Sequence, residues 1–381
     1  MQATKKLGMD IDEQKKAMKI FGEELGNQNP EIFNGIKDGL SWANNYYWGD
    51  KDIMELNNRI INACLKRYGI SRNSLKKLIS HQNIVYSYTK DNKEYILRVT
   101  NSKRRNLKFI YGELDWISFL SDNKVSVSSA IESLNGKLIE VVTVDGNDFF
   151  ITAFKKAYGI YAKKQFRNKE LFKNMGRLTG EMHNLSKQCN LNKKYFYRPQ
   201  WYNSNLLNYI NMTVDKSETL IYKEFYNTLN ELNQLPKNYS SYGIIHSDIH
   251  FKNFNVSDNA ITYFDFDDCE YGWFVNDISV QLFYFYVENY DSNEKEKDAR
   301  CFIKGFLEGY NKENQIDNYW ITKLPLFLKL REIIMYSMLY NWKTFDSCSP
   351  WVKNYMIYRK ECIENKKPLI DLDFSKLCHG I

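Results

Sequence analysis

The residues best suited to chemistry lie in one short segment, GIIHSDIHFKNFNVSDNAITYFDFDDCEYGWFVNDIS, residues 243–279. An apolar run leads into His246 and Asp248, and Asn253 follows five residues after Asp248. The runs on either side of a Ser-Asp-Asn turn predict a tight hairpin that returns Asp265 close to Asn253. Carboxylate and amide oxygens suit Mg²⁺, which takes its other ligands from water and substrate phosphates. The segment therefore predicts a magnesium site beside a second carboxylate that orients a hydroxyl for attack on phosphorus.

This spacing follows the arrangement of a kinase catalytic site. There, an H-x-D-x-x-x-x-N loop supplies the catalytic Asp and one metal ligand, and a later D-F-x supplies the main metal ligand. HSDIHFKN (246–253) fits the first pattern, and DFD (265–267) fits the second with Asp where protein kinases carry Gly. A coincidental turn rich in Asp and Asn is the alternative, because both residues are common turn formers. That alternative does not explain why four positions all occur in register: His246, Asp248, Asn253 and Asp265.

The elements that would position this segment can be read from the hydrophobic pattern. Apolar residues follow a helical period over 52–68, and alternating runs with a polar turn predict a hairpin at 83–100. A second amphipathic helix is expected at 107–120, followed by a second hairpin at 137–154. After Gly159 the pattern is mainly helical to about residue 365. The order hairpin, helix, hairpin predicts an α+β layer with a mostly antiparallel sheet.

Composition limits the other classes of protein. The chain has 381 residues, a net charge of +7 and seven cysteines without a C-x-x-C pair, which favours a reduced cytoplasmic protein without a disulfide framework or zinc knuckle. The charge permits an anionic small-molecule partner but falls short of a nucleic-acid-binding footprint.

The N-terminus lacks the apolar region of a secretory signal. The stretch 324–342 is broken by Lys329, Arg331 and Glu332, so it predicts a buried helix rather than a membrane span. No pattern predicts an oligomeric state.

At these motifs the chain resembles the aminoglycoside phosphotransferase and choline kinase-like family, small-molecule kinases with the protein-kinase fold. The residues that carry the resemblance are HSDIHFKN (246–253), YFDFDDCEYGWF (263–274) and Asp277-Ile278-Ser279. The chain departs from the family at Ser247, where Gly is usual. The resemblance extends over residues 75–345 and leaves the N-terminal segment outside it.

The resemblance implies a cation on the third strand, paired with an acid on the following helix. Arg98, at the centre of EYILRVT, takes the place where kinases usually carry Lys, and its guanidinium can hold phosphate oxygens. Glu113 is the expected partner, with Asp115 as its competitor. The loop from Ser80 to Asn83 is expected to cradle phosphates through backbone N–H groups, although it contains no glycine.

The remaining roles follow from the same resemblance. Asp248 is the expected catalytic base, or the group that orients the acceptor hydroxyl, while Asn253 and Asp265 hold Mg²⁺. The adenine of ATP is expected against Ile151–Lys155, held by backbone groups of Ala153 and Phe154. GTP is the alternative phosphate donor. His250 is expected either to contact the γ-phosphate or to be a structural histidine.

Other polar residues of the segment have more than one interpretation. His246 is expected to brace the catalytic loop, and Asp277 to accept backbone N–H bonds from it. Asp267 and Asp268 either bind a second metal or a cationic substrate, or form a solvated acidic turn.

The acceptor is left open by the sequence. Acids beside aromatic residues would suit a cationic acceptor such as an aminoglycoside or choline, and homoserine-type or sugar acceptors remain as alternatives. Two other functions are kept: a bacterial protein Ser/Thr kinase of the same fold, and a catalytically silent, spore-coat-like structural protein.

We therefore expect a bilobal α+β protein with nucleotide in the cleft between the lobes. Residues 1–74 form a helical extension, residues 75–155 the small antiparallel lobe, and residues 156–381 the larger helical lobe. The partners are a nucleotide and a small hydroxyl-bearing acceptor, with no nucleic acid and no membrane.

Overall fold

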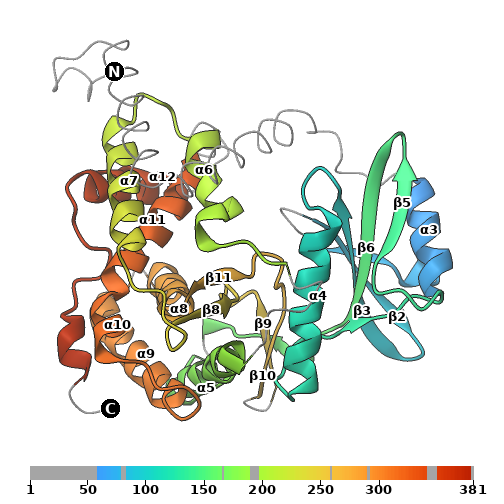
Figure 1. Ribbon diagram of the computed structural model, residues 1–381, viewed down its shortest axis with the longest axis horizontal. Coiled ribbons are helices and arrows are strands. Elements are labelled where there is room, and N and C mark those ends of the chain that lie inside the picture. Colours follow the sequence, from blue (N-terminus) through green and yellow to red (C-terminus); the bar gives the residue numbers. More distant parts are fainter. Residues whose placement is uncertain are drawn as a thin grey trace.

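The protein has an α+β, bilobal architecture, as the sequence predicts (Figure 1). The computed structural model describes residues 58–78, 83–164, 167–188, 197–257, 260–289, 292–340 and 350–378. Most of the predicted N-terminal extension, residues 1–57, lies outside them.

The N-terminal lobe is built on an antiparallel sheet in the order β1-β2-β3-β6-β4, with β5 also paired to β6. Its strands are β1 (Lys76–Leu78), β2 (Ile84–Lys90), β3 (Lys93–Asn101), β4 (Ala130–Ile131), β5 (Glu140–Val144) and β6 (Asn147–Lys155). Its helices are α3 (Asn58–Tyr68), the short η2 (Arg72–Ser74) and α4 (Leu107–Asp122). Both predicted hairpins and the amphipathic helix between them are therefore confirmed.

Each hairpin turn has a backbone that matches its residues. Asp91 and Asn92 have φ of 51° and 57°, and Asp145 and Gly146 have φ of 50° and 75°. Two successive positive φ values are typical of the tight turns whose twist suits a two-residue hairpin loop, and Asp, Asn and Gly tolerate them best. The turns fix the strand register, which sets Arg98 opposite Val85 on one side and Thr152 on the other.

Alternation along the strands divides the sheet into two faces. Leu97 and Ala153 belong to a cluster with α3 residues such as Ile60 and Cys64. Phe154 belongs instead to the main core, which includes α4. Helix α3 thus covers one face of the sheet, and α4 lies between the other face and the C-terminal lobe (Figure 1). The predicted boundaries at residues 74 and 155 stay predictions.

The C-terminal lobe is mostly helical, with two small sheets. Its helices are α5 (Lys169–Gln188), η4 (Trp201–Asn203), α6 (Asn205–Thr213), α7 (Thr219–Asn233), α8 (Phe274–Glu288), α9 (Lys295–Tyr310), α10 (Asn318–Thr322), α11 (Leu324–Tyr340), α12 (Pro350–Glu364) and η6 (Phe374–Cys378). Its strands are β7 (Ile160–Tyr161), β8 (Tyr242–Ile245), β9 (Phe254–Ser257), β10 (Ala260–Tyr263) and β11 (Glu270–Trp273). Strand order is β10-β9-β7 in one sheet and β11-β8 in the other.

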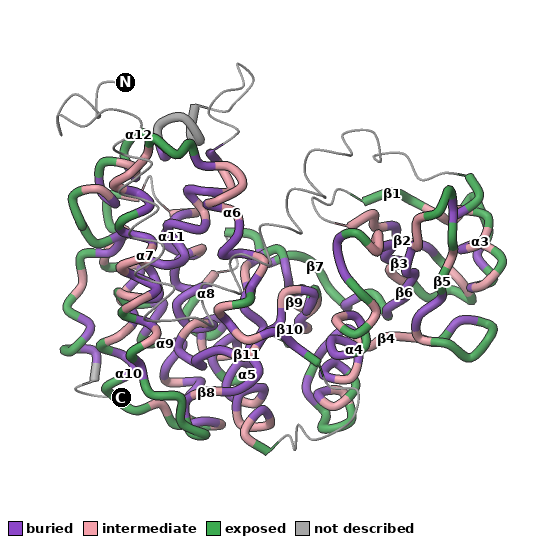
Figure 2. The backbone as a smooth tube through the Cα atoms, turned by 45° about the horizontal axis from the view of Figure 1, so that its top comes forward, coloured by how far each residue is buried: buried purple, intermediate pink, exposed green. Residues whose placement is uncertain are grey.

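Helix α11 corresponds to the apolar stretch 324–342, which the sequence predicts to be a buried helix. Buried residues lie all around it, and Arg331 and Glu332 are 3% and 2% exposed. Figure 2 shows buried backbone concentrated where the C-terminal helices meet. Within the described ranges, no helix is both long and apolar enough to cross a bilayer.

Helices α5 and α9 approach each other closely through glycines spaced four residues apart on each. A Cβ added at Gly176 would lie 1.9 Å from the carbonyl oxygen of Phe306, and one at Gly309 would lie 1.9 Å from that of Lys173. No side chain fits at these distances, so the two backbones set the spacing on which α8 and the core of the lobe are packed.

Replacing Gly176 with Ala is therefore expected to destabilise the protein although Ala is the better helix former by about 1 kcal/mol. We expect a net loss of about 1–3 kcal/mol in the free energy of unfolding, because the two helices must separate to admit the methyl group. Urea denaturation would measure it, with Arg177→Ala on the exposed face of α5 as the control, expected to change stability by less than about 0.5 kcal/mol. Unchanged or increased stability of Gly176→Ala would contradict the packing described.

Candidate active site

The loop after β8 is held by one buried carboxylate. Asp277, in the first turn of α8, is fully buried and accepts hydrogen bonds from the backbone N–H of His246 at 2.9 Å and of Ser247 at 2.7 Å. Its Oδ2 also lies 3.1 Å from Nε2 of His183 on α5. The predicted role of Asp277 in bracing the loop is thus confirmed. His246 braces it too, because its Nε2 lies 3.1 Å from the carbonyl oxygen of Phe264.

Ser247 explains why the resembled family favours glycine at its position. Its φ is 68°, in the left-handed region that costs most side chains about 1–2 kcal/mol. The Ser247 hydroxyl donates a hydrogen bond of 2.9 Å to Oε1 of Glu270, and the residue is 2% exposed. Burial raises the pKa of Glu270 to about 8, against the opposing effect of the Ser204 and Ser247 hydroxyls. Here a serine with a buried partner occupies the conformation usually given to glycine.

Asp248, the predicted catalytic residue, is contacted from three directions. Arg331 of α11 donates from Nη2 to Oδ1, and Nδ2 of Asn253 donates to the Asp248 backbone oxygen at 2.9 Å and to Oδ2 at 3.4 Å. Nε2 of His250 lies 3.6 Å from Oδ2. Burial alone would raise the pKa of Asp248, but Arg331, His250 and His246 outweigh it and hold that pKa well below its usual range. Asp248 is therefore an anion at neutral pH, suited to orient a hydroxyl.

The predicted hairpin exists and brings the two predicted metal ligands to its open end. Strand β9 pairs with β10 so that Phe254 lies opposite Tyr263, and the N–H of Phe264 donates to the carbonyl oxygen of Asn253 at 3.0 Å. Asp265 follows at once with φ of 65°. Since Nδ2 of Asn253 is bound to Asp248, its oxygen is directed elsewhere.

The donor set fits a hard divalent cation. Asp265 is exposed, and its carboxylate forms no hydrogen bond or ion pair with any residue that the structure describes. Partial loss of hydration and repulsion from Asp267 raise its pKa to about 7, against the attraction of Arg98. A cation at this position would relieve that repulsion. One carboxylate and one amide leave most coordination positions to phosphate and water, as Mg²⁺ prefers. No group of three His, Cys, Asp or Glu side chains in the described ranges is arranged as a self-sufficient metal site.

Arg98 and Glu113 form the predicted pair. Arg98 Nη1 donates to Oε1 of Glu113 at 2.8 Å and Nη2 donates to Oε2 at 2.7 Å, and both side chains are almost fully buried. The guanidinium also lies 5.0 Å from the ring centre of Phe154. Two parallel bonds fix its orientation, and Nε has no hydrogen-bond partner among the described residues.

Ala153 and Phe154 stand at the predicted adenine position but their backbones lie within the sheet. They pair with Leu97 and Ile96 of β3 on one side and with β4 on the other. Nucleotide contact by these two residues, like a γ-phosphate contact by His250, stays a prediction. Of the predicted phosphate loop, residues 80–82 lie outside the described residues.

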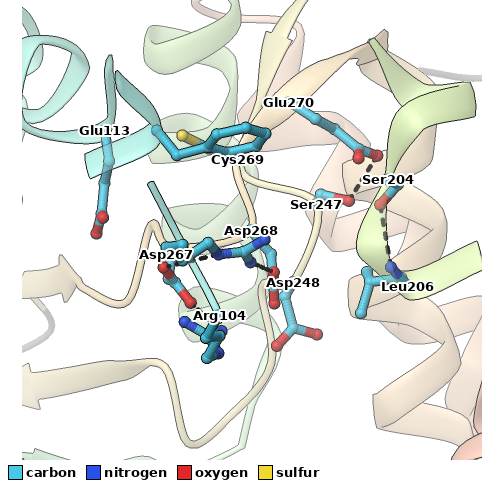
Figure 3. Close-up of polar contacts among 12 residues, drawn as sticks. Arg104, Glu113, Ser204, Leu206, Ser247, Asp248, Asp267, Asp268, Cys269 and Glu270 are labelled. Atoms are coloured by element: carbon cyan, nitrogen blue, oxygen red, sulfur yellow. Dashed lines mark hydrogen bonds and ion pairs between the residues drawn. The ribbon is translucent and has the colours of Figure 1, made fainter. Parts of the chain in front are cut away.

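Two arginines that the sequence analysis missed join the lobes. Arg104 donates to Asp267, and the two residues lie close together in Figure 3. Arg105 contacts both Asp267 and Asp268. Arg104 also donates to Oδ1 of Asn83 at 3.1 Å. The alternative of a solvated acidic turn is therefore wrong, because Asp267 is 5% exposed and ion-paired. Sequence separations of more than 160 residues left no local signal for these pairs.

A pocket lies behind the catalytic loop. It is lined by Trp201, Ser204, Leu206, Leu207, Leu232, Ser247, Glu270, Gly272, Trp273, Asn276, Val280, Phe327, Leu330, Arg331 and Ile334. Three buried polar atoms on its lining residues have no hydrogen-bond partner in the described part of the chain: Nε1 of Trp201, Oε2 of Glu270 and Nε of Arg331. Buried polar atoms are normally bonded, so these are the groups that water or a ligand would satisfy.

Comparison with known proteins agrees with the geometry. Residues 77–311 match the phosphotransferase enzyme family. An amicoumacin kinase of Bacillus subtilis (strain 168) is 34% identical over 334 residues, 86% of this chain and 98% of that protein. Amicoumacin kinase hAmiN, solved in complex with AMP-PNP, Ca²⁺ and Ami, has a TM-score of 0.80 at 30% identity, covering 85% of this chain and 97% of that chain.

A more distant solved structure shares the fold. The microcompartment-associated aminopropanol kinase has a TM-score of 0.67 at 20% identity, covering 81% of this chain and 97% of that chain.

Fold and site together define a small-molecule kinase with a protein-kinase-like fold. The chain belongs to the phosphotransferase enzyme family, and the resemblance seen in its motifs is confirmed. It is an enzyme that transfers a phosphoryl group to an alcohol group, so the silent structural module is set aside.

The strained serine gives a direct test of the loop geometry. Ser247→Gly and Ser247→Ala both lose the hydrogen bond to Glu270, but only Ala also keeps a Cβ in the left-handed region. We therefore expect Ser247→Ala to be less stable than Ser247→Gly by about 1 kcal/mol or more, measured by thermal unfolding. Equal stability of the two variants would mean that Ser247 does not have the backbone conformation described.

Proposed function

We propose that this protein transfers the γ-phosphate of ATP, with Mg²⁺, to a hydroxyl group of a small molecule of the amicoumacin type. The observation that carries the proposal is the convergence of Asp248, Asn253 and Asp265 at the end of one β hairpin. The ionised carboxylate of Asp248 accepts a hydrogen bond from the amide of Asn253. The hairpin returns the chain to Asn253 at Phe264, and the solvent-accessible Asp265 follows it. This is the set of groups that phosphoryl transfer requires for positioning and charge neutralisation.

Each residue has a role that follows from its contacts. Asn253 and Asp265 hold Mg²⁺, which supplies charge neutralisation on the nucleotide phosphates. Arg98 is held by Glu113 through Nη1 and Nη2. The Nε edge of its guanidinium is left to bind phosphate oxygens. Asp248 accepts a hydrogen bond from the acceptor hydroxyl and aligns it. Because its pKa is held low, orientation contributes more than early proton removal.

The donor is taken as ATP because the relative with the TM-score of 0.80 is solved with AMP-PNP, an ATP analogue. That structure holds Ca²⁺, and the preference for Mg²⁺ rests on the donor set of this chain. GTP is the alternative donor and belongs in the same assay.

The acceptor is expected to carry little positive charge. The pocket behind the catalytic loop has a cavity of about 30 Å³, which has space for water only, so this expectation rests on the charged groups near the loop. Asp268, which the sequence suggested for a cationic substrate, is paired with Arg105, and Glu288 at the end of α8 is paired with Arg167. Their charge is already neutralised, so acceptors of high positive charge are disfavoured relative to amicoumacin-type compounds.

An acceptor screen tests this proposal. Purified protein with ATP or GTP and Mg²⁺ is given amicoumacin A, spectinomycin, 1-amino-2-propanol, choline, homoserine and a protein Ser/Thr substrate, and ADP or GDP release is followed. We expect the largest acceptor-dependent rate with amicoumacin A. Phosphorylation of the protein substrate alone would favour the protein-kinase alternative.

The role of Asp248 is tested in the same assay. Asp248→Ala is expected to lower the acceptor-dependent rate at least about 100-fold, because the acceptor hydroxyl loses its alignment. Nucleotide affinity, measured by calorimetry with AMP-PNP, is expected to change little. A variant that turns over at the wild-type rate would refute the assignment of Asp248.

A further inference from the structure

Helix α11 reaches the catalytic carboxylate from outside the part of the chain that matches the family. The match ends at residue 311, and α11 spans Leu324–Tyr340. From this helix Arg331 donates through Nη2 to Oδ1 of Asp248 and, at 2.7 Å, to the hydroxyl of Tyr284 on α8. Arg331 is 3% exposed, so its charge has been removed from water for a specific contact.

The surroundings fix the guanidinium in place. Its carbon lies 5.0 Å from the centre of the Tyr284 ring, and the His250 ring lies 4.8 Å from the same ring. Arg331, Tyr284 and His250 therefore form a layer against Asp248, drawn from α11, α8 and the catalytic loop. A planar guanidinium bonded to two oxygens on different elements has little freedom to rotate.

The two oxygens of Asp248 consequently differ. Oδ1 carries the charge-assisted bond from Arg331. Among the residues that the structure describes, Oδ2 has longer contacts, 3.4 Å to Asn253 and 3.6 Å to His250. A carboxylate held at one oxygen keeps its plane, so the other oxygen has a defined direction in which to receive a hydroxyl.

We propose that Arg331 is a positioning residue for the phosphoryl transfer, holding Asp248 by Oδ1 so that Oδ2 meets the acceptor hydroxyl. This inference rests on the proposed role of Asp248. Arg331 acts through that carboxylate and need not touch the nucleotide. A displacement of about 1 Å in such a group can cost about 100-fold in rate, so the effect is expected in kcat rather than in nucleotide binding.

A structural role for Arg331 must be separated from a positioning role, and the helix provides a matched control. The next residue, Glu332, accepts a hydrogen bond from Arg359 of α12, and both members of this pair are 2% exposed. Arg359→Gln therefore breaks a buried ion pair on the same helix, one residue away. Its contact does not involve the catalytic loop.

The experiment compares Arg331→Gln, Arg331→Lys and Arg359→Gln for kcat, nucleotide KM and thermal stability. Acceptor-dependent turnover is measured together with slow hydrolysis of ATP, in which water replaces the acceptor. We expect Arg331→Gln to lose about 10–100-fold in kcat with nucleotide KM within about two-fold of wild type. Arg331→Lys, which keeps the charge but not the fork, is expected to recover part of the rate, and Arg359→Gln to keep nearly all of it.

The possible failures are distinguishable. Wild-type turnover that does not depend on Asp248 would defeat the proposed function. Turnover that depends on Asp248 but is unchanged in Arg331→Gln would overturn the positioning role alone. So would an equal loss of kcat in Arg359→Gln at a matched loss of stability, or a loss confined to nucleotide KM.

Discussion

The active site depends on the anchoring of one loop by one buried carboxylate. Asp277 accepts hydrogen bonds from two successive backbone N–H groups of the catalytic loop, and Nε2 of His183 contacts its Oδ2. A buried carboxylate is costly unless it is well bonded, and these three donors satisfy it. The loop that follows β8 is therefore fixed to α8 and α5, the helices at the centre of the C-terminal lobe. The direction of Asp248 and the start of β9 follow from this attachment.

Charge balance accounts for the rest of the site. Asp248, Asp267 and Asp268 each have an arginine partner from a distant element. Asp265, between them in sequence, has none within the described residues and its pKa is raised. Of these four carboxylates, Asp265 alone lacks an ion-pair partner among the described residues. By neutralising the neighbouring acids, the arginines make Asp265 the carboxylate that we propose as a metal ligand.

The sequence predicts the local parts of this arrangement well and the long-range parts poorly. The Asp-Asn turn at residues 91–92 sets the register of β3, and with it the position of Arg98. The alternating runs before and after the Ser-Asp-Asn segment predict that Asp265 returns close to Asn253. Ser247 could be recognised as unusual because glycine was expected there, although its bond to Glu270 could not. Arg331 could be read only as a charge that interrupts an apolar helix. Its partner lies 83 residues away, and periodicity carries no information on which buried arginine meets which acid.

The most direct test of the account is whether Asp265 makes nucleotide binding depend on the metal. Calorimetric titration of AMP-PNP, with and without Mg²⁺, would compare the wild type with Asp265→Asn, since Asn tolerates the left-handed backbone that Asp265 adopts. If Asp265 holds the metal, Mg²⁺ is expected to strengthen AMP-PNP binding to the wild type at least about ten-fold, as a bridging metal would, and this gain is expected to disappear in the variant. An equal gain from Mg²⁺ in both proteins would contradict the placement of the metal at Asp265.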